Sequence, residues 1–176
     1  AHDLEADAIK VLCHHAKENR YKIRIAAMGR SNIHDASILL NTNVNDLHFH
    51  MHIKNDVTQN KLDTIFQNLL KTIEFIRKQK PEACISIAML DIGKTHDSII
   101  EQCISFINSL NIDILSLPDT SGMMAPNQVF EKISIAFTTP HFSLIHKVFN
   151  SSKYSFKMIF SNSRISFTIT KHSIIN

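Results

Sequence analysis

The feature that most constrains this chain is a short apolar segment followed by a polar loop and an amphipathic helical pattern, repeated four times. The middles of the four apolar segments lie roughly 24 to 38 residues apart, a spacing that fits βα units. Right-handed crossovers join such units into one parallel sheet with helices outside it. The repeat therefore predicts an α/β fold, closed as a barrel or open and doubly wound. The predicted strands are Tyr21–Met28, Asp46–Ile53, Cys84–Leu90 and Ile112–Leu117.

Apolar residues at helical spacing mark the segments before and between these strands. Pro81 ends the longest of them, because proline cannot continue a helix. The predicted helices are Leu4–Lys17, Ile33–Leu40, Leu62–Lys80, a segment from Ile99 to Leu110, and Asn127 to about Phe137.

The second predicted strand alternates without interruption between apolar residues and histidines, so His48, His50 and His52 share one face. Side chains two positions apart on a strand are about 7 Å apart by the rise per residue. Two imidazoles at this spacing can bind one zinc or other divalent ion. The alternative is that the histidines line a polar interior or face solvent.

The segment Ile112–Pro126 contains a buried strand that runs into a polar loop. Pro118 lacks an N–H group and ends the ladder, and Asp119 and Thr120 follow it directly. α/β proteins place ligand contacts at the carboxyl ends of parallel strands. We therefore expect Asp119 and Thr120 to contact a substrate, Thr120 by donating a hydrogen bond and Asp119 by organising the loop. The alternative is a turn that only stops the strand.

Arg30, at the end of the first predicted strand, is a second candidate for substrate binding. Its cation can approach an anionic substrate at the carboxyl end of the sheet. The alternative is an arginine exposed to solvent.

Composition limits the class of protein. The chain has 176 residues, 44% of them hydrophobic and 20% charged, which is ordinary for a soluble globular domain. It shows neither a transmembrane stretch nor a signal peptide, so we expect a cytoplasmic protein. The three cysteines, Cys13, Cys84 and Cys103, are far apart and suggest buried thiols. The net charge of +3 is too small to indicate a nucleic-acid partner.

The last part of the chain has a different pattern. Residues 1–140 contain the βα repeats, whereas His141–His146 fits a fifth parallel strand. Tyr154–Phe160 and Ile165–Thr170 alternate around Ser161–Ser163, which favours an antiparallel hairpin. We therefore treat residues 141–176 as a separate C-terminal part made of a strand or a hairpin.

Three segments, in order, resemble one enzyme family. Leu117–Pro126 is similar to a motif that reads Asp-Thr-x-Gly followed by Pro, and Ile85–Lys94 and Leu47–His48 stand where two preceding strands are expected. The family is that of the TIM-barrel acyltransferases and lyases, which includes isopropylmalate synthase, homocitrate synthase, citramalate synthase and hydroxymethylglutaryl-CoA lyase. Residues of about Ala6 to Ile133 look like the middle of its barrel. The resemblance implies a partial TIM (β/α) barrel with parallel strands, to which the alternating pattern of the last residues adds a β-hairpin at the end.

The resemblance also implies a function. Such enzymes join acetyl-CoA to a 2-oxo acid, or run the related cleavage, with a divalent metal (Mg, Mn or Zn) as Lewis acid. In the family, an aspartate after the first strand and a His-x-His pair after the seventh hold this metal. His48 matches a histidine that points into the barrel, and His146 is the candidate metal ligand. The resemblance suggests amino-acid biosynthesis and either a homo-oligomer or part of a longer chain.

Two positions depart from the family pattern. Leu90 replaces a glutamate and Lys94 replaces an arginine in the fifth-strand motif; leucine accepts no hydrogen bond and lysine lacks the guanidinium fork. The catalytic residues are therefore not identified in this sequence. The alternative to an enzyme is a non-catalytic binding or assembly module built on a truncated barrel.

Overall fold

The computed structural model describes residues 3–138, 154–161 and 164–171. Its helices are α1 (Asp3–Glu18), α2 (Ile33–Leu40), α3 (Gln59–Gln79), the short 3₁₀ helix η1 (Ile92–Lys94), α4 (Asp97–Ser109) and α5 (Pro126–Thr138). Its strands are β1 (Ala26–Arg30), β2 (Asp46–His52), β3 (Cys84–Leu90), β4 (Ile114–Pro118), β5 (Tyr154–Ser161) and β6 (Arg164–Lys171). None of the helices in these ranges is both long and apolar enough to span a membrane.

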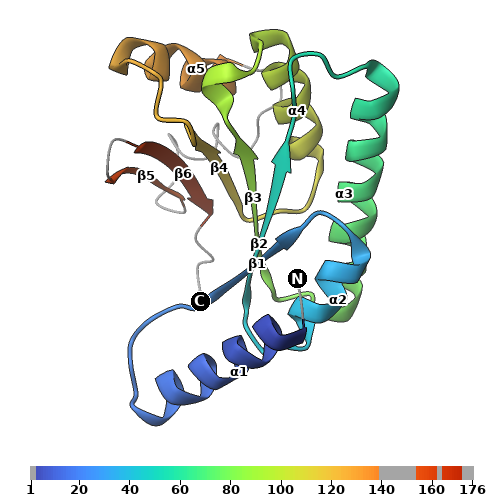
Figure 1. The fold of residues 1–176 in the computed structure, drawn as a ribbon, viewed down its shortest axis with the longest axis vertical. Helices are drawn as coiled ribbons and strands as arrows, with labels where there is room; N and C mark the ends of the chain where they lie inside the picture. Colours follow the sequence, from blue (N-terminus) through green and yellow to red (C-terminus); the bar gives the residue numbers. More distant parts are fainter. Residues whose placement is uncertain (1–2, 139–153, 162–163, 172–176) are drawn as a thin grey trace.

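These strands form one sheet in the order β1-β2-β3-β4-β6-β5 (Figure 1). The first four run parallel, each separated from the next by at least one helix. The hairpin of β5 and β6 joins the sheet through antiparallel pairing of β6 with β4. The chain thus has the α/β fold that its repeat predicts, with four parallel strands in the order in which they occur in the sequence.

The hydrophobic core lies between the parallel strands and the helices α2, α3 and α4, which lie together on one side of the sheet (Figure 1). Alternate strand residues point into it. Phe49, Ile85 and Ile87 are completely buried, as is Leu69 of α3. Burial of a side chain of this size contributes about 1.5 to 3 kcal/mol, so this one-sided packing fixes which face of each strand is left for polar residues.

Arg77, near the end of α3, connects this helix to the beginnings of β3 and β4. Its Nη1 donates to the carbonyl oxygen of Ala83 at 2.6 Å, and its Nη2 donates to Asp113 Oδ2 at 2.8 Å. Asp113 in turn accepts a hydrogen bond from the backbone N–H of Ile85 at 2.9 Å. One guanidinium therefore sets the position of two neighbouring strands at their amino ends.

The predicted first strand was placed too early. The structure has β1 at Ala26–Arg30 and not at Tyr21–Met28, and Ile23 is 61% exposed. The reason is the register, in which Ala26 pairs with Asp46, the first residue of β2. Residues before Ala26 have no neighbouring strand, so their alternating pattern produces no ladder. Gly29 and Arg30 consequently lie in the strand and not in a loop after it.

The other strand predictions agree with the structure to within two residues. β3 has the predicted bounds, β2 ends one residue early and β4 begins at Ile114. The predicted hairpin of the C-terminal part is present as β5 and β6. The predicted strand at His141–His146 lies outside the described residues, as does the candidate ligand His146.

Candidate functional site

The side of the sheet opposite α2, α3 and α4 carries polar side chains from all four parallel strands. We call this surface the polar face, and it consists of Arg30, His48, His50, Ser86 and Ser116. The register arranges these residues in two rows across the strands. One row contains Met28, His48, Ser86 and Ile114, and the next, nearer the carboxyl ends, contains Arg30, His50, Ala88 and Ser116.

His48 is held in place by the neighbouring strand. Its Nδ1 lies 2.6 Å from Ser86 Oγ, and this hydrogen bond fixes the orientation of the imidazole ring. Burial, together with the neighbouring His50, lowers the pKa of His48 below its ordinary value. The imidazole is therefore neutral at pH 7, and it exchanges a hydrogen bond with Ser86 without bringing a charge to the polar face.

Arg30 is oriented by a buried carboxylate. Its Nε and Nη2 donate to the two oxygens of Asp35, each at 3.1 Å, and its backbone N–H donates to Oδ2 at 3.0 Å. The side chain of Asp35 is fully buried, whereas that of Arg30 is 67% exposed. Asn32 caps α2 by accepting from the N–H of Asp35 at 2.8 Å. The cap of α2 thus fixes the position of Asp35, and Asp35 fixes the orientation of the Arg30 side chain.

The loops that follow β3 and β4 are connected by Asp91. Its Oδ1 accepts hydrogen bonds from the backbone N–H of Ser121 at 3.0 Å and from Ser121 Oγ at 2.6 Å. Hydrogen bonds from Ser121 and from the Thr120 side chain lower the pKa of Asp91. Lys94 Nζ lies 3.6 Å from Asp91 Oδ2. These contacts hold Thr120 close to the end of β3.

Asp119 is the most buried of the predicted site residues, with 2% of its surface exposed. Its Oδ2 accepts from the backbone N–H of Met124 at 2.9 Å, and its carbonyl oxygen accepts from Gly122 N–H at 3.1 Å. Within the described residues its Oδ1 has no hydrogen-bond partner. These hydrogen bonds hold the loop in its conformation, and one buried oxygen of Asp119 is left for a further donor.

The sequence-predicted residues thus lie at two separate places on the sheet. Arg30 and His48 are on the neighbouring strands β1 and β2, whereas Asp119 and Thr120 follow β4. Strands in a sheet are spaced about 4.8 Å apart, so roughly 10 Å of sheet separates His48 from the loop after β4.

Asp35, Ser86, Asp91 and Ser121 are not among the site residues predicted from the sequence, although Asp91 and Ser121 lie in the segments Ile85–Lys94 and Leu117–Pro126. Ser86 had a usable signal, since it is a hydroxyl on the same side of its strand as Cys84. Asp91 also had one, because it directly follows a strand. Ser121 also had one, because it follows Thr120 in the polar loop after a strand, whereas Asp35 had none, because its contact with Arg30 depends on where α2 meets the end of β1 in the fold.

A pocket of about 400 Å³ lies between η1, the start of α4 and α5, behind the two loops. Lys132 of α5 closes one side of it by donating to the carbonyl oxygen of Thr95 at 2.7 Å and to Asp97 Oδ1 at 2.5 Å. Its remaining lining is mixed, and consists of Gly93, Lys94, Met123, Met124, Gln128 and Glu131. The charges that line it occur with both signs, so it shows no preference for an anion or a cation.

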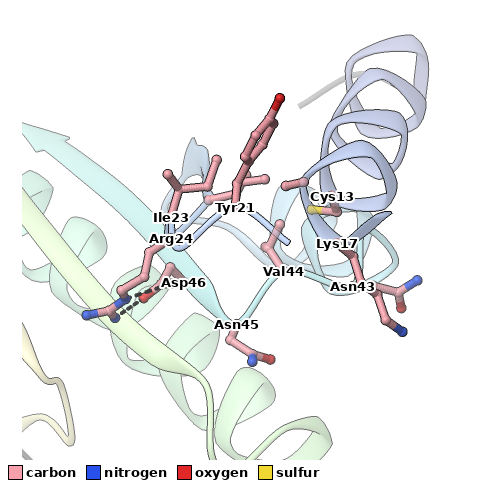
Figure 2. Close-up of a pocket in the computed structure, with 11 residues that line it drawn as sticks. Cys13, Lys17, Tyr21, Ile23, Arg24, Asn43, Val44, Asn45 and Asp46 are labelled. Atoms are coloured by element: carbon pink, nitrogen blue, oxygen red, sulfur yellow. Dashed lines mark hydrogen bonds and ion pairs between the residues drawn. The ribbon is translucent and has the colours of Figure 1, made fainter. Parts of the chain in front are cut away.

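A second pocket, of about 290 Å³, lies at the opposite end of the sheet (Figure 2). It is formed by the last part of α1, the extended segment before β1 and the residues before β2. Figure 2 shows Arg24 of this segment paired with Asp46. Asp46 raises the pKa of Arg24 through this hydrogen bond. The pair fastens the segment to the sheet, which gives this end a structural role.

The histidine pattern does not produce a complete metal site. In residues 3–138 and the two strands of the hairpin, no three His, Cys, Asp or Glu side chains come together as metal ligands. His48 Nδ1 is already engaged by Ser86, and Asp91 is engaged by Ser121. The described residues therefore do not by themselves fit a divalent metal ion.

Parallel βα units in sequential order, with polar residues gathered at the carboxyl ends of the strands, define the class of proteins built on a (β/α) barrel. The sequence model of the HMGL-like family matches residues 2–143. The chain belongs to the HMGL-like family, and its fold is a partial TIM barrel. This family includes lyases and condensing enzymes and generally depends on a divalent metal.

Among solved structures, the chain is similar to the HMG-CoA lyase from Brucella melitensis, with a TM-score of 0.56 and 12% sequence identity. The likeness covers 66% of this chain and 44% of that one, so the chain spans less than half the length of that lyase. At this identity the likeness shows the fold alone. A search of curated proteins gives no match.

Proposed function

We propose that this chain is part of a metal-dependent enzyme that condenses acetyl-CoA with a 2-oxo acid, or catalyses the related cleavage. Its membership of the HMGL-like family supports this reading. The observation that carries it is the loop after β4, in which buried Asp119 fixes the backbone and Thr120 is held beside Asp91. A hydroxyl in a fixed loop at a strand end is suited to bind a carboxylate or carbonyl oxygen.

Each residue has a distinct part in this proposal. When the 2-oxo acid binds, the Thr120 hydroxyl turns its single proton from Asp91 to this ligand, and Asp119 keeps the loop in the conformation that allows it. Arg30 offers the N–H groups that Asp35 does not use to an anionic group of the ligand. His48 presents a neutral imidazole with a fixed orientation. The metal, whether Mg, Mn or Zn, would be held by ligands outside the described residues.

The same proposal covers the substrates, the cellular location and the association of the protein. Acetyl-CoA and a 2-oxo acid are its substrates, with a place in amino-acid biosynthesis in the cytoplasm. We also infer association into a homo-oligomer or with further polypeptide. Within the described residues, the outer edge of β1 has no neighbouring strand, and an unpaired strand edge favours association.

The experiment is an assay for free CoA with the intact protein, acetyl-CoA and a panel of 2-oxo acids, with and without added Mg²⁺, Mn²⁺ or Zn²⁺. We expect metal-dependent release of CoA with at least one acid. Thr120→Ala should reduce kcat/KM by about ten- to a hundred-fold, the loss expected for one hydrogen bond to a charged group. Ser98→Ala, an exposed position on α4, is the matched control. Failure of every acid, together with no bound metal in elemental analysis, would refute the proposal.

A non-catalytic binding or assembly module is the second candidate. The specific observation in its favour is that no group of three metal-ligating side chains forms among the described residues. Leu90 and Lys94, which replace the glutamate and arginine of the family motif, point the same way. This candidate predicts that Thr120→Ala changes no turnover measured with the intact protein, so the assay above separates the two functions.

A further inference from the structure

The helix α1 has apolar residues on two faces, and the protein covers one of them. On the inner face, Ile9 and Cys13 pack against the hydrophobic core. The outer face carries residues at spacings of three and four, which lie on one side of a helix. We call them the outer stripe, and they are Leu4, Ala8, Val11, Leu12 and His15. Leu4 is 76%, Val11 67% and Leu12 57% exposed, so no described residue covers the stripe.

Exposed apolar side chains continue the outer stripe beyond the end of the helix. The rings of His15 and Tyr21 meet edge to face, with their centroids 5.9 Å apart. Tyr21 and Ile23 are 55% and 61% exposed, and Figure 2 shows that they project to the same side of the extended segment. Pairing of β1 starts at Ala26, so no described strand pairs with this segment. Single exposed apolar residues are ordinary on a protein surface, whereas a contiguous row of them indicates an interaction site.

The two ends of this apolar surface carry opposite charges. The first turn of α1 contains Asp3 and Glu5. The end of the helix and the segment after it contain Lys17, Arg20 and Lys22, which are exposed and form no ion pair with a described residue. The surface is therefore complementary to a partner that is apolar in the middle, with a basic group opposite the first turn and an acidic group opposite the segment after the helix.

A second copy of the chain meets these requirements. A two-fold axis brings the same surface of both copies together. When the two helices run antiparallel, the acidic first turn of each copy lies beside the basic segment of the other, whereas a parallel arrangement would bring like charges together. Ala8 lies between Leu4 and Leu12 in the outer stripe, and its small side chain leaves room for a larger one from the other helix.

We propose that α1 and the segment after it form the contact of a two-fold symmetric homodimer, in which the helices of the two copies pack antiparallel. The inference narrows the association proposed above to one surface and one partner, and it does not depend on the reaction. Ala8 packs beside the partner's Leu12, and Glu5 pairs with the partner's Arg20 at each end. Because α1 is only about 24 Å long at 1.5 Å per residue, the interface is small, and we expect a reversible dimer with a Kd of about 1 to 100 μM.

The first test is sedimentation equilibrium of the intact protein over concentrations that span this Kd. Leu12→Asp should raise the Kd at least about ten-fold, since the two-fold axis places the unpaired carboxylate in the interface twice. Phe130→Asp is the matched control. It changes an exposed apolar residue of α5, at the opposite end of the molecule (Figure 1), and should keep the Kd within about two-fold of the wild-type value.

The second test uses charge reversal and does not depend on the fold of Leu12→Asp. Glu5→Arg and Arg20→Glu should each raise the Kd about three- to ten-fold at low salt, because each places like charges together at both ends of the interface. An equimolar mixture of the two variants should associate within about two-fold of the wild-type protein, because the antiparallel heterodimer restores both pairs of opposite charge. Lys61→Glu, an exposed position on α3, is the control and should leave the Kd unchanged.

Three results would overturn the inference. A wild-type protein that stays monomeric at every concentration would mean that the outer stripe has another occupant. A dimer that Leu12→Asp leaves unchanged would place the contact elsewhere, such as the outer edge of β1. A mixture of the charge variants that associates no better than either alone would exclude the antiparallel arrangement. None of these results changes the release of CoA that tests the proposed reaction, and failure of that assay leaves the dimer in place.

Discussion

Asp91 accepts two hydrogen bonds from Ser121, one from its backbone N–H at 3.0 Å and one from its hydroxyl at 2.6 Å. The two residues are thirty positions apart, on the loops that follow β3 and β4. Asp91 adopts a left-handed backbone conformation with φ of 60°, which aspartate tolerates better than most residues. The carboxylate thereby points across to the next loop, and Thr120 beside it is positioned by the same contact.

This contact predicts the effect of removing the carboxylate. Asp91→Ala should lower the free energy of unfolding by about 1 to 2 kcal/mol, because the bonds from Ser121 are charge-assisted but lie close to solvent. Ser121→Ala should cost less, since its backbone N–H still donates. Urea unfolding at pH 7 measures both, with the exposed Asp56→Asn as control. Equal effects of Asp91→Ala and Asp56→Asn would contradict this role.

The Arg30–Asp35 pair predicts a pH dependence of stability. Burial by itself would raise the pKa of Asp35, but the hydrogen bonds from Arg30 outweigh it and hold the pKa well below its ordinary value. A carboxyl whose pKa is lower in the folded state stabilises the protein above its unfolded pKa, about 3.9 for aspartate. This contribution is lost as the pH falls through the folded-state value.

We therefore expect Asp35→Asn to destabilise the protein by about 2 to 3 kcal/mol at pH 7, because a charge-assisted pair is removed from a buried position. The difference from the wild-type protein should shrink as the pH is lowered from 4 toward 2. Urea unfolding across this range measures it. Glu74→Gln, an exposed carboxylate on α3, should show no such trend, and a constant deficit in Asp35→Asn at every pH would contradict the linkage.

Gly29 predicts a packing limit at β1. A Cβ atom at this position would lie 2.9 Å from Leu39 Cδ1 and 3.3 Å from Asp35 Cβ. Leu39 is itself fully buried and cannot move without displacing core atoms, so Gly29→Ala should destabilise the protein by about 1 to 3 kcal/mol. Thermal unfolding measures the change, with exposed Ala26→Ser on the same strand as control. Adding Leu39→Val should recover part of the loss, and additive effects of the two substitutions would argue against a direct clash.

The cysteines predict an order of chemical reactivity. Burial raises the pKa of Cys103 to about 12, so almost no thiolate is present in the folded protein at pH 8. Cys103 should therefore react with iodoacetamide only after unfolding. Cys13, which is partly exposed, should react in the native state. Peptide mass spectrometry after timed labelling measures both, and rapid native labelling of Cys103 would show that α4 packs less closely than described.

How much of the fold the sequence predicts depends on whether each signal is local. β2 was predicted closely because its alternation of buried and polar residues is contained in the segment, and β3 because it is a short apolar run that ends at Asp91. β1 was misplaced because the residues before Ala26 alternate equally well, and only the start of β2 at Asp46 decides where pairing begins. α3 begins at Gln59, three residues before the prediction, because its polar first turn carries no apolar periodicity.

The same difference between local signals and long-range contacts applies to the candidate site. The loop of Asp119 and Thr120 was found because a proline and polar residues at a strand end form a local pattern. The partners of Arg30 and His48 were not, because Asp35 and Ser86 come close only through the α2 cap and the register between β2 and β3. That Arg30 and His48 bind substrate remains a prediction.

The arrangement of the parallel strands has a consequence for how the chain assembles. β1, β2, β3 and β4 lie side by side in the order in which they are synthesised, so each new strand can add to the edge left by the one before it. Among the strands that the structure describes, none has to be inserted between two that are already paired, and each parallel contact closes a loop of only one βα unit. Chains with such short loops fold faster than those with distant pairings. Growth of this sheet can therefore proceed stepwise during translation, and β6 caps the last edge when its residues emerge.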